Sequence, residues 1–343
     1  MKDYTDYILD QTKKLLDIDS PSGYTHEVIS YVEDQLTSMG YKPTHTNKGG
    51  LMVALGGENK EDGLLLQAHV DTIGGIVAEV KNNGCLRIDK IGGLNPNAAE
   101  AENVRVYTRN KQVYEGTCQL LNPSTHVNNV HGDTKRTYET LEIVLDEFVE
   151  TKQETEALGI KVGDYVCFEP RFRVTKQGFI KGRFLDNKLS AAVALAYAKY
   201  LKDEQVTPQR AVYIHFTVFE EVSHGGSASV PEGTTEVLAF DMGCVGKGLN
   251  GSERKLSICV KDAFGPYNYD MVSGLIEAAE QAEVDYVLDV YPHYGSDADM
   301  AVRAGHDVRH GLIGPGVYAS HGYERSHIKA AMATFETVKH YVK

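Results

Sequence analysis

Two segments near the start of the chain carry apolar residues at helical spacing. TDYILDQTKKLL and HEVISYVEDQLTSMG each place these side chains on one face when wound at about 3.6 residues per turn. The positions are Ile8, Leu9, Thr12, Leu15 and Leu16 in the first segment, and Val28, Ile29, Val32, Leu36 and Met39 in the second. Gly40 stands where a helix C-terminus favours glycine. We therefore predict two amphipathic helices separated by the break SPSG.

Two short apolar runs follow and are typical of strands. LMVAL at 51–55 and GLLLQAHV at 63–70 are continuous rather than alternating. Continuous runs of this length are expected where a strand is buried on both faces, in a sheet that helices cover on both sides.

The pattern changes after Gly75. Between residues 76 and 174 there is no long helical stripe, and short alternating pieces are separated by Gly, Asn, Pro and Asp. The pieces are IVAEV, CLRID, VRVYTR, VYEGTCQL, LEIVLDEF and DYVCFEP. This pattern predicts a small all-β domain inserted into the chain.

Helix-like and strand-like segments alternate again after residue 174. LSAAVALAYAKYLKD, MVSGLIEAAEQA and HIKAAMATFETVKHYV are predicted helices, and AVYIHFTVF, EVLAFDM and YVLDVY are predicted strands. We therefore predict an α/β catalytic domain formed by residues 1–75 and 175–343, with residues 76–174 as the inserted β-domain.

Side chains that can bind metal recur where the predicted α/β strands end. His69 follows GLLLQA, Glu220 and Glu221 follow AVYIHFTVF, Asp241 follows EVLAF, Asp186 precedes a helix and His321 follows GLIGPGVYAS. Ligand sites of open α/β sheets lie outside the carboxyl ends of the strands, so we expect one shared crevice. Imidazoles and carboxylates suit zinc and neighbouring metals, and this number of them suits two ions with one spare carboxylate as general base.

Six motifs in this order resemble the M42 family of metallo-aminopeptidases, which includes glutamyl, tetrahedral and deblocking aminopeptidases. They are SPSG, AHVDTIG, FLDNK, FEEV with FDMG, YGSDA and SHGYER, and they span nearly the whole chain. The resemblance implies a phosphorylase-like or hydrolase-like α/β/α domain with an inserted β-barrel-like domain. It also implies a homo-oligomer, a dodecamer built from dimers, assembled through the insertion.

The resemblance also implies a role for each site residue. His69 and Asp241 would bind the first metal, Glu221 and His321 the second, and Asp186 would bridge the two. Glu220 would be the general base, and the Asp71 carboxylate would orient the His69 imidazole from behind, as carboxylates commonly do for metal-bound histidines. Zinc is expected first, with cobalt or manganese as alternatives.

Simpler interpretations exist for each of these residues. His69 and Asp71 alone would suit a capped strand end, Asp186 an N-cap, and Glu220 with Glu221 a solvated charge pair. His306 and His310 compete with His321, while His126 and His131 of the insertion are surface histidines by default. Ser296 and Asp297 form either an ordinary turn or a site for the substrate amine, and Cys244 is assigned to packing. Ser223 and Asn187 depart from the commonest family residues but remove no ligand.

Composition narrows the choice of partners and compartment. The chain has 343 residues and a net charge of -13, without a basic cluster, which argues against nucleic acid or an anionic membrane as partner. No apolar run could span a bilayer and no secretory segment is visible, so we expect a cytoplasmic protein. The five cysteines form no C-x-x-C and are expected to be reduced and mostly buried.

We therefore expect an exopeptidase that hydrolyses N-terminal residues from peptides with a metal-activated water. The alternatives are an amidase or deacylase acting on N-acyl amino acids, a glycan hydrolase, and a non-catalytic assembly protein that keeps the metals. The preferred N-terminal residue stays open, although Lys247, Arg254 or Lys261 could favour acidic side chains.

Overall fold

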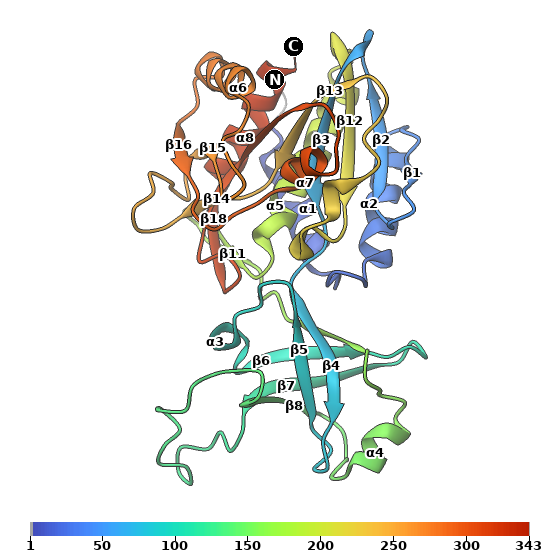
Figure 1. The fold of residues 1–343 in the computed structure, drawn as a ribbon, viewed down its shortest axis with the longest axis vertical. Helices are drawn as coiled ribbons and strands as arrows, with labels where there is room; N and C mark the ends of the chain where they lie inside the picture. The colour runs from blue at the N-terminus through green and yellow to red at the C-terminus, as the bar shows by residue number, and fades with distance from the viewer. Residues whose placement is uncertain (1–2, 343) are drawn as a thin grey trace. The chain divides into compact units, whose positions relative to one another are not determined.

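The computed structural model describes residues 3–342, which form two compact units (Figure 1). The first unit runs to Asp71 and resumes at Arg171, and the second is Thr72–Pro170. The breaks thus lie a few residues before the domain boundaries expected from the sequence.

The first unit is built on a twelve-stranded mixed sheet. Its strands are β1 (Thr44–His45), β2 (Leu51–Gly56), β3 (Asn59–His69), β10 (Arg173–Val174), β11 (Phe179–Gly182), β12 (Arg210–Thr217), β13 (Thr234–Phe240), β14 (Gly243–Val245), β15 (Leu256–Lys261), β16 (Tyr286–Val290), β17 (Arg309–Tyr318) and β18 (Glu324–His327). The main order is β1-β2-β12-β3-β13-β17-β18-β11-β10, and β14 and β15 also pair with β17. At its centre β12, β3, β13 and β17 run parallel, so their carboxyl ends meet at one edge.

Helices cover both faces of this sheet. They are α1 (Thr5–Leu16), α2 (His26–Ser38), α5 (Leu185–Asp203), α6 (Tyr269–Gln281), α7 (Asp297–Arg303) and α8 (Ile328–Tyr341), with two 3-10 turns, η1 (Glu220–Val222) and η2 (Gly225–Ser227). Figure 1 shows α7 in front of the central strands and α5 behind them. The predicted α/β class is confirmed.

The helical stripes of the sequence are largely the buried faces of α1 and α2. Ile8, Leu15, Val28 and Val32 are buried, whereas Met39 lies at the end of α2 and is only half-buried. Gly40 follows that end with φ +82, the left-handed conformation that glycine adopts without strain. Its placement after the helix is confirmed.

One strand prediction was wrong in its burial. The 64–70 run of β3 is buried throughout, as expected for a central strand. LMVAL instead forms β2 with alternating burial, and Ala54 is exposed. β2 lies towards the edge of the sheet, next to the two-residue β1, where one face is incompletely covered.

The second unit is a closed barrel of six strands. Its elements are β4 (Gly74–Val80), β5 (Leu86–Ile91), β6 (Glu102–Tyr107), β7 (Val113–Leu120), β8 (Leu141–Leu145) and β9 (Tyr165–Phe168), with α3 (Pro96–Ala99) and α4 (Lys152–Ala157). The barrel order is β4-β5-β8-β7-β6-β9. α4 was not predicted, although TKQE carries a capping-box signal: Thr151 and Glu154 each accept a hydrogen bond from the other's backbone N–H group.

The helices and the cysteines bear on two expectations from composition. Among residues 3–342, no helix is long and apolar enough to cross a membrane. All five cysteines are free, and Cys118, Cys167 and Cys259 are buried.

A buried lysine of α5 forms hydrogen bonds to the end of α1. Lys188, in the first turn of α5, is 1% exposed, and its ammonium donates to the main-chain oxygens of Leu15 (2.8 Å) and Ile18 (2.6 Å). These carbonyls lie at the C-terminus of α1, where helices leave carbonyls unpaired and favour positive charge. The lysine of the FLDNK motif therefore joins α1 to the segment that carries Asp186.

We expect Lys188→Met to destabilise the fold. The methionine fills similar volume but removes the ammonium from both carbonyls. The Leu15 carbonyl keeps the Ile18 N–H at 3.3 Å, whereas the loss at Ile18 leaves a carbonyl whose lack of a partner costs about 1–3 kcal/mol. The urea midpoint of metal-free protein should fall, while Lys42→Met, at an exposed lysine, should leave it unchanged. Equal midpoints for the two variants would refute this role.

Candidate metal centre

The last residue of β3 places an imidazole at the carboxyl edge of the sheet. His69 lies beside Thr217 of β12, and Asp241 directly follows β13, the other neighbour of β3. His69 and Asp241 are both buried. The parallel pairing thus brings together two side chains that are far apart in the sequence, as predicted.

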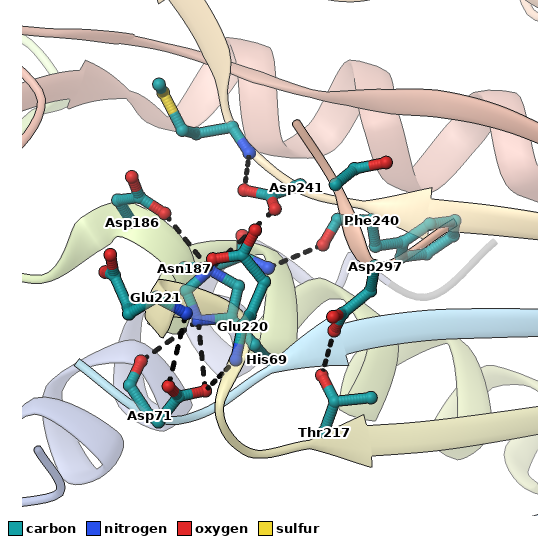
Figure 2. A network of polar contacts seen from close by, with 12 residues as sticks. His69, Asp71, Asp186, Asn187, Thr217, Glu220, Glu221, Phe240, Asp241 and Asp297 are labelled. Atoms are coloured by element: carbon teal, nitrogen blue, oxygen red, sulfur yellow. Dashed lines mark hydrogen bonds and ion pairs between the residues drawn. The ribbon is translucent and has the colours of Figure 1, made fainter. Parts of the chain in front are cut away.

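Three carboxylates surround one nitrogen of His69 (Figure 2). Its Nε2 lies 3.2 Å from Asp186 Oδ1, 3.6 Å from Glu220 Oε2 and 3.8 Å from Asp241 Oδ2. A neutral imidazole cannot satisfy three carboxylates by itself. Carboxylates gathered this closely repel one another unless a proton or a cation lies among them.

Asp186 also faces a second histidine. Its other oxygen, Oδ2, lies 3.5 Å from His321 Nε2, and the same nitrogen is 3.4 Å from Glu221 Oε2. One carboxylate therefore has one oxygen near each imidazole. The Asp186 carboxylate thus faces the two histidines, and Asp186 and Asn187 interrupt the helical backbone at the start of α5.

Glu220 and Glu221 lie on a short turn rather than at the end of a strand. β12 ends at Thr217, and the two glutamates begin the 3-10 turn η1. Their side chains contact different histidines, Glu220 facing His69 and Glu221 facing His321. They are not a solvated pair, since their side chains are only 16% and 4% exposed.

The Asp71 side chain does not make the contact that was predicted for it. His69 Nδ1 lies 3.0 Å from the main-chain oxygen of Asp71 and 3.6 Å from its carboxylate. The carboxylate instead accepts hydrogen bonds from the backbone N–H groups of Glu220 (3.2 Å) and Glu221 (3.4 Å) and from the Ser22 hydroxyl (2.5 Å). The Asp71 carbonyl thus contacts the imidazole, while its side chain holds the glutamate turn.

The pKa values of these side chains are shifted because several carboxylates are buried close together. Burial raises the pKa of Glu220 and of Glu221 well above the ordinary value, and burial with the nearby Asp186 raises that of Asp241 to about 7. Burial opposes the charged form of His321, yet Asp186 and Glu221 raise its pKa to about 10. The cluster takes up positive charge wherever a proton can supply it.

This donor set fits divalent cations. Two groups of donor atoms lie within 4.8 Å of one another: His69, Glu220 and Asp241 in one, and His69, Asp186 and Glu221 in the other. Both groups contain His69, and the first contains the predicted base Glu220 in place of Asp186. Imidazole and carboxylate ligands at neighbouring positions suit zinc and similar metals.

A cavity of about 290 Å³ opens onto the cluster. It is lined by Asp186, Glu220, Glu221, Asp241 and His321, together with Ser223, Met242, Cys244, His293, Tyr294, Gly295 and Ser320. An adjoining cavity of about 260 Å³ shares Glu220 and adds Ala263, Phe264, Ser296 and Met300. The carboxylates are therefore accessible to a small substrate from one side.

The competing residues lie elsewhere or take no ligand position. His310 pairs with Asp299 at 3.5 Å, and His131 of the barrel unit with Glu100 at 3.8 Å, while His126 is exposed. Cys244 lines the cavity, but burial raises the pKa of its thiol to about 12, so it is no ready thiolate. His306 joins neither group of donor atoms.

Sequence reasoning missed the contacts of several residues that hold the candidate ligands in place. Glu324, three residues after His321, accepts hydrogen bonds from the backbone N–H groups of Asp186 and His321. Asn187 donates its amide to the main-chain oxygen of Phe240 at 2.6 Å, which a deprotonated aspartate could not do. In the sequence, Glu324 and Asn187 were marked only by the motifs that contain them. A motif does not say which neighbour a polar side chain contacts.

Known proteins share both the sequence pattern and the fold. The family model of the M42 glutamyl aminopeptidases matches residues 49–336. The YhfE protein of Bacillus subtilis (strain 168), whose name describes a proposed aminopeptidase, is 42% identical over 96% of each chain. The glutamyl aminopeptidase of Lactococcus lactis subsp. cremoris (strain MG1363) is 25% identical over 64% of this chain and 61% of its own length.

Solved structures with little sequence identity have the same fold. The TET aminopeptidase of Thaumarchaeota archaeon SCGC AB-539-E09 superposes with a TM-score of 0.88 at 19% identity, covering 98% of this chain and 96% of that one. The Pyrococcus horikoshii TET1 peptidase gives 0.84 at 21% identity, covering 98% and 99%. Together with the family match, this shows that the chain belongs to the M42 glutamyl aminopeptidase family, whose members are metal-dependent exopeptidases.

Proposed function

We propose that this protein is a two-metal aminopeptidase that removes N-terminal residues from peptides. The observation that carries the proposal is Asp186, whose two oxygens lie 3.2 Å from His69 Nε2 and 3.5 Å from His321 Nε2. A carboxylate placed between two imidazoles suits a bridge between two ions. His69 and Asp241 would hold one ion with it, and Glu221 and His321 the other.

The remaining carboxylate, Glu220, has the position of a general base. A bound metal pair would polarise the scissile carbonyl and lower the pKa of an attacking water. Glu220 lines both cavities, so its carboxylate can accept the proton of that water and return it to the leaving amine. Its backbone is fixed by Asp71, which limits the positions that the carboxylate can take.

The first test separates an aminopeptidase from a deacylase. The cavity edge contains carboxylates that would attract a protonated α-amine, and N-acylation removes that charge. We expect turnover of an unblocked aminoacyl p-nitroanilide, little turnover of its N-acetyl form, and none after a chelator removes the metal. Faster cleavage of N-acyl amino acids would favour the deacylase instead.

We further propose a preference for uncharged N-terminal side chains. Among the residues described as lining the two cavities there is no lysine or arginine, and neither Lys247, Arg254 nor Lys261 belongs to them. Met242, Phe264, Tyr294 and Met300 supply apolar surface, and burying a leucine side chain gives about 1.5–3 kcal/mol. Leucyl and methionyl substrates should therefore exceed glutamyl and lysyl ones in kcat/KM by at least about tenfold. A preference for glutamyl substrates would refute this assignment.

We also propose a homo-oligomer assembled through the barrel unit. The Pyrococcus horikoshii TET1 peptidase can assemble into a tetrahedron or a large octahedral shell, and this chain shares its fold. Replacing residues 72–170 by a short Gly-Ser linker should reduce the particle mass measured by light scattering to that of a monomer or dimer. A full-size oligomer after this deletion would contradict the assignment.

A further inference from the structure

Strained backbone surrounds the proposed ligands. Phe184, Phe219, Ser223 and His321 have φ values of 67, 73, 66 and 60, in the left-handed region that non-glycine residues seldom adopt. Phe184 precedes Asp186, Phe219 and Ser223 bracket the two glutamates, and His321 is a ligand itself. Such conformations persist only where surrounding contacts enforce them.

Asp297 spans the segment that carries the glutamates. Its carboxylate accepts a hydrogen bond from the Thr217 hydroxyl (Figure 2). It accepts another from the Gly226 backbone N–H at 2.6 Å. Thr217 is the last residue of β12 and Gly226 lies in η2, so the two contacts enclose the strained turn on both sides. A Cβ on Gly226 would lie 2.1 Å from the Asp297 main-chain oxygen, which explains the glycine there.

Asp297 is poorly placed to bind substrate. It is 3% exposed and lines neither cavity, whereas its neighbour Ser296 lines one. Both carboxylate oxygens already have partners within the protein. The side chain therefore faces the loop that carries the glutamates rather than the substrate.

Glu324 has the corresponding position for the second metal. One oxygen accepts from the Asp186 backbone N–H at 3.1 Å, and the other accepts from the His321 backbone N–H at 3.0 Å. The side chain is 2% exposed and begins β18. It thus joins two ligand-bearing segments that are separated by more than a hundred residues and each contain a left-handed residue.

We propose that Asp297 and Glu324 are positioning residues of the hydrolytic site, which extends the function proposed above and rests on it. Asp297 holds the turn that presents Glu220. Glu324 holds Asp186 and His321 at the spacing that the second metal needs. Neither touches the substrate, and each acts through the backbone of the segment it holds.

Replacing the carboxylate by an amide should have different effects at Asp297 and Glu324, because their hydrogen-bond partners differ. Thr217 is a hydroxyl, which can donate or accept, so an asparagine at 297 can keep both contacts by donating to Thr217 and accepting from Gly226. Both partners of Glu324 are backbone N–H groups, which only donate. A glutamine at 324 would therefore turn its own N–H groups towards one of them and lose that contact.

The experiment at 297 compares kcat, KM and metal content. Asp297→Ala should lower kcat about 10²-fold with little change in KM, because the displaced turn carries the base Glu220. The metal content should fall by no more than the one ion that Glu221 of the same turn would bind. Asp297→Asn should recover most of the loss, and Thr217→Val, which removes one contact, should fall between them. Asp285→Ala, at an exposed aspartate, is the control.

Two results would overturn the positioning role of Asp297. If Asp297→Asn is as damaged as Asp297→Ala and both raise KM, the charge itself acts on the substrate amine. If both variants retain wild-type kcat, Asp297 does not position the base. If Asp297→Ala does not fold, the comparison of Asp297→Asn with Thr217→Val decides between the same two results.

The experiment at 324 uses elemental analysis of dialysed protein. Glu324→Gln should weaken one of the two metals about 10–100-fold, leaving near one metal per chain, and excess zinc should partly restore kcat. Glu324→Asp should behave alike, because a shorter side chain cannot reach both N–H groups. Glu277→Gln, at an exposed glutamate, should keep two metals.

Two metals per chain and normal kcat in both Glu324 variants would overturn this assignment. Wild-type activity on unblocked substrates is measured first. Its absence would refute the proposed function, whereas a normal wild type with unaffected variants would refute only the positioning roles. The metal content of the Glu324 variants remains informative in either case.

Discussion

Replacing Glu220 by glutamine is expected to abolish turnover while leaving the bound metal in place. The amide keeps the shape of the side chain but cannot accept a proton from water. A positioned general base typically contributes 10²–10⁴-fold, so kcat should fall by about that factor. Metal content by elemental analysis should stay at the wild-type value, added metal should not restore activity, and Glu277→Gln should behave as wild type.

Glu221→Gln is the matched comparison, because the two glutamates share one turn and differ in their partners. Glu221 contacts His321 rather than His69, and a neutral amide is a poorer metal donor than a carboxylate. Activity and metal content should therefore fall together, and excess metal should partly restore turnover.

The pair of variants can also contradict the assignment of roles. His69, Glu220 and Asp241 form one of the two close groups of donor atoms, which would allow Glu220 to bind metal. Loss of metal from Glu220→Gln would show that it is a ligand. An exchange of behaviour between the two variants would keep the site and reverse the two roles.

Asp186→Asn is expected to cause the second large loss. The residue is the only proposed ligand that contacts both histidines, so removing its charge weakens both ions rather than one. Metal content should fall below that of Glu221→Gln. The ions would stabilise the charge of the transition state by several kcal/mol, so their loss should lower kcat/KM ~10³-fold or more.

The control for this variant is Asp285→Asn, at an exposed aspartate. Far-ultraviolet circular dichroism separates loss of metal from loss of fold. Asp186→Asn with full metal content would show that Asp186 does not bridge, and the arrangement of both ions would have to be assigned again.

Periodicity predicted those elements in which one physical force dominates. The helices over TDYILDQTKKLL and HEVISYVEDQLTS and the central strand ending at His69 follow from apolar spacing alone. Burial of β2 could not be predicted this way, since LMVAL has the composition of a central strand. Its exposure depends on its place near the sheet edge, which is set by long-range pairing.

The proposed ligands were predictable as a set, because each belongs to a motif or follows an apolar strand. The parallel strands then bring His69 and Asp241 together without further information. The contacts of Asp71 were not predictable, because its carboxylate meets backbone N–H groups of Glu220 and Glu221. Any residue type could supply those groups, so the sequence contains no signal for them.

The contacts of Glu324 and Asp297 escaped prediction for the same reason, although Asp297 was already a candidate for the substrate amine. Both carboxylates accept hydrogen bonds from the backbone at positions far away in the chain. Such contacts appear only once the fold fixes which loops are neighbours.

The central claim, a pair of ions bridged by Asp186, is tested most directly by anomalous diffraction from crystals of zinc-loaded protein. We expect two peaks per chain about 3.5–4 Å apart, with Asp186 between them. His69 and Asp241 should contact one peak, and Glu221 and His321 the other. A single peak, or two peaks of which only one contacts Asp186, would contradict it.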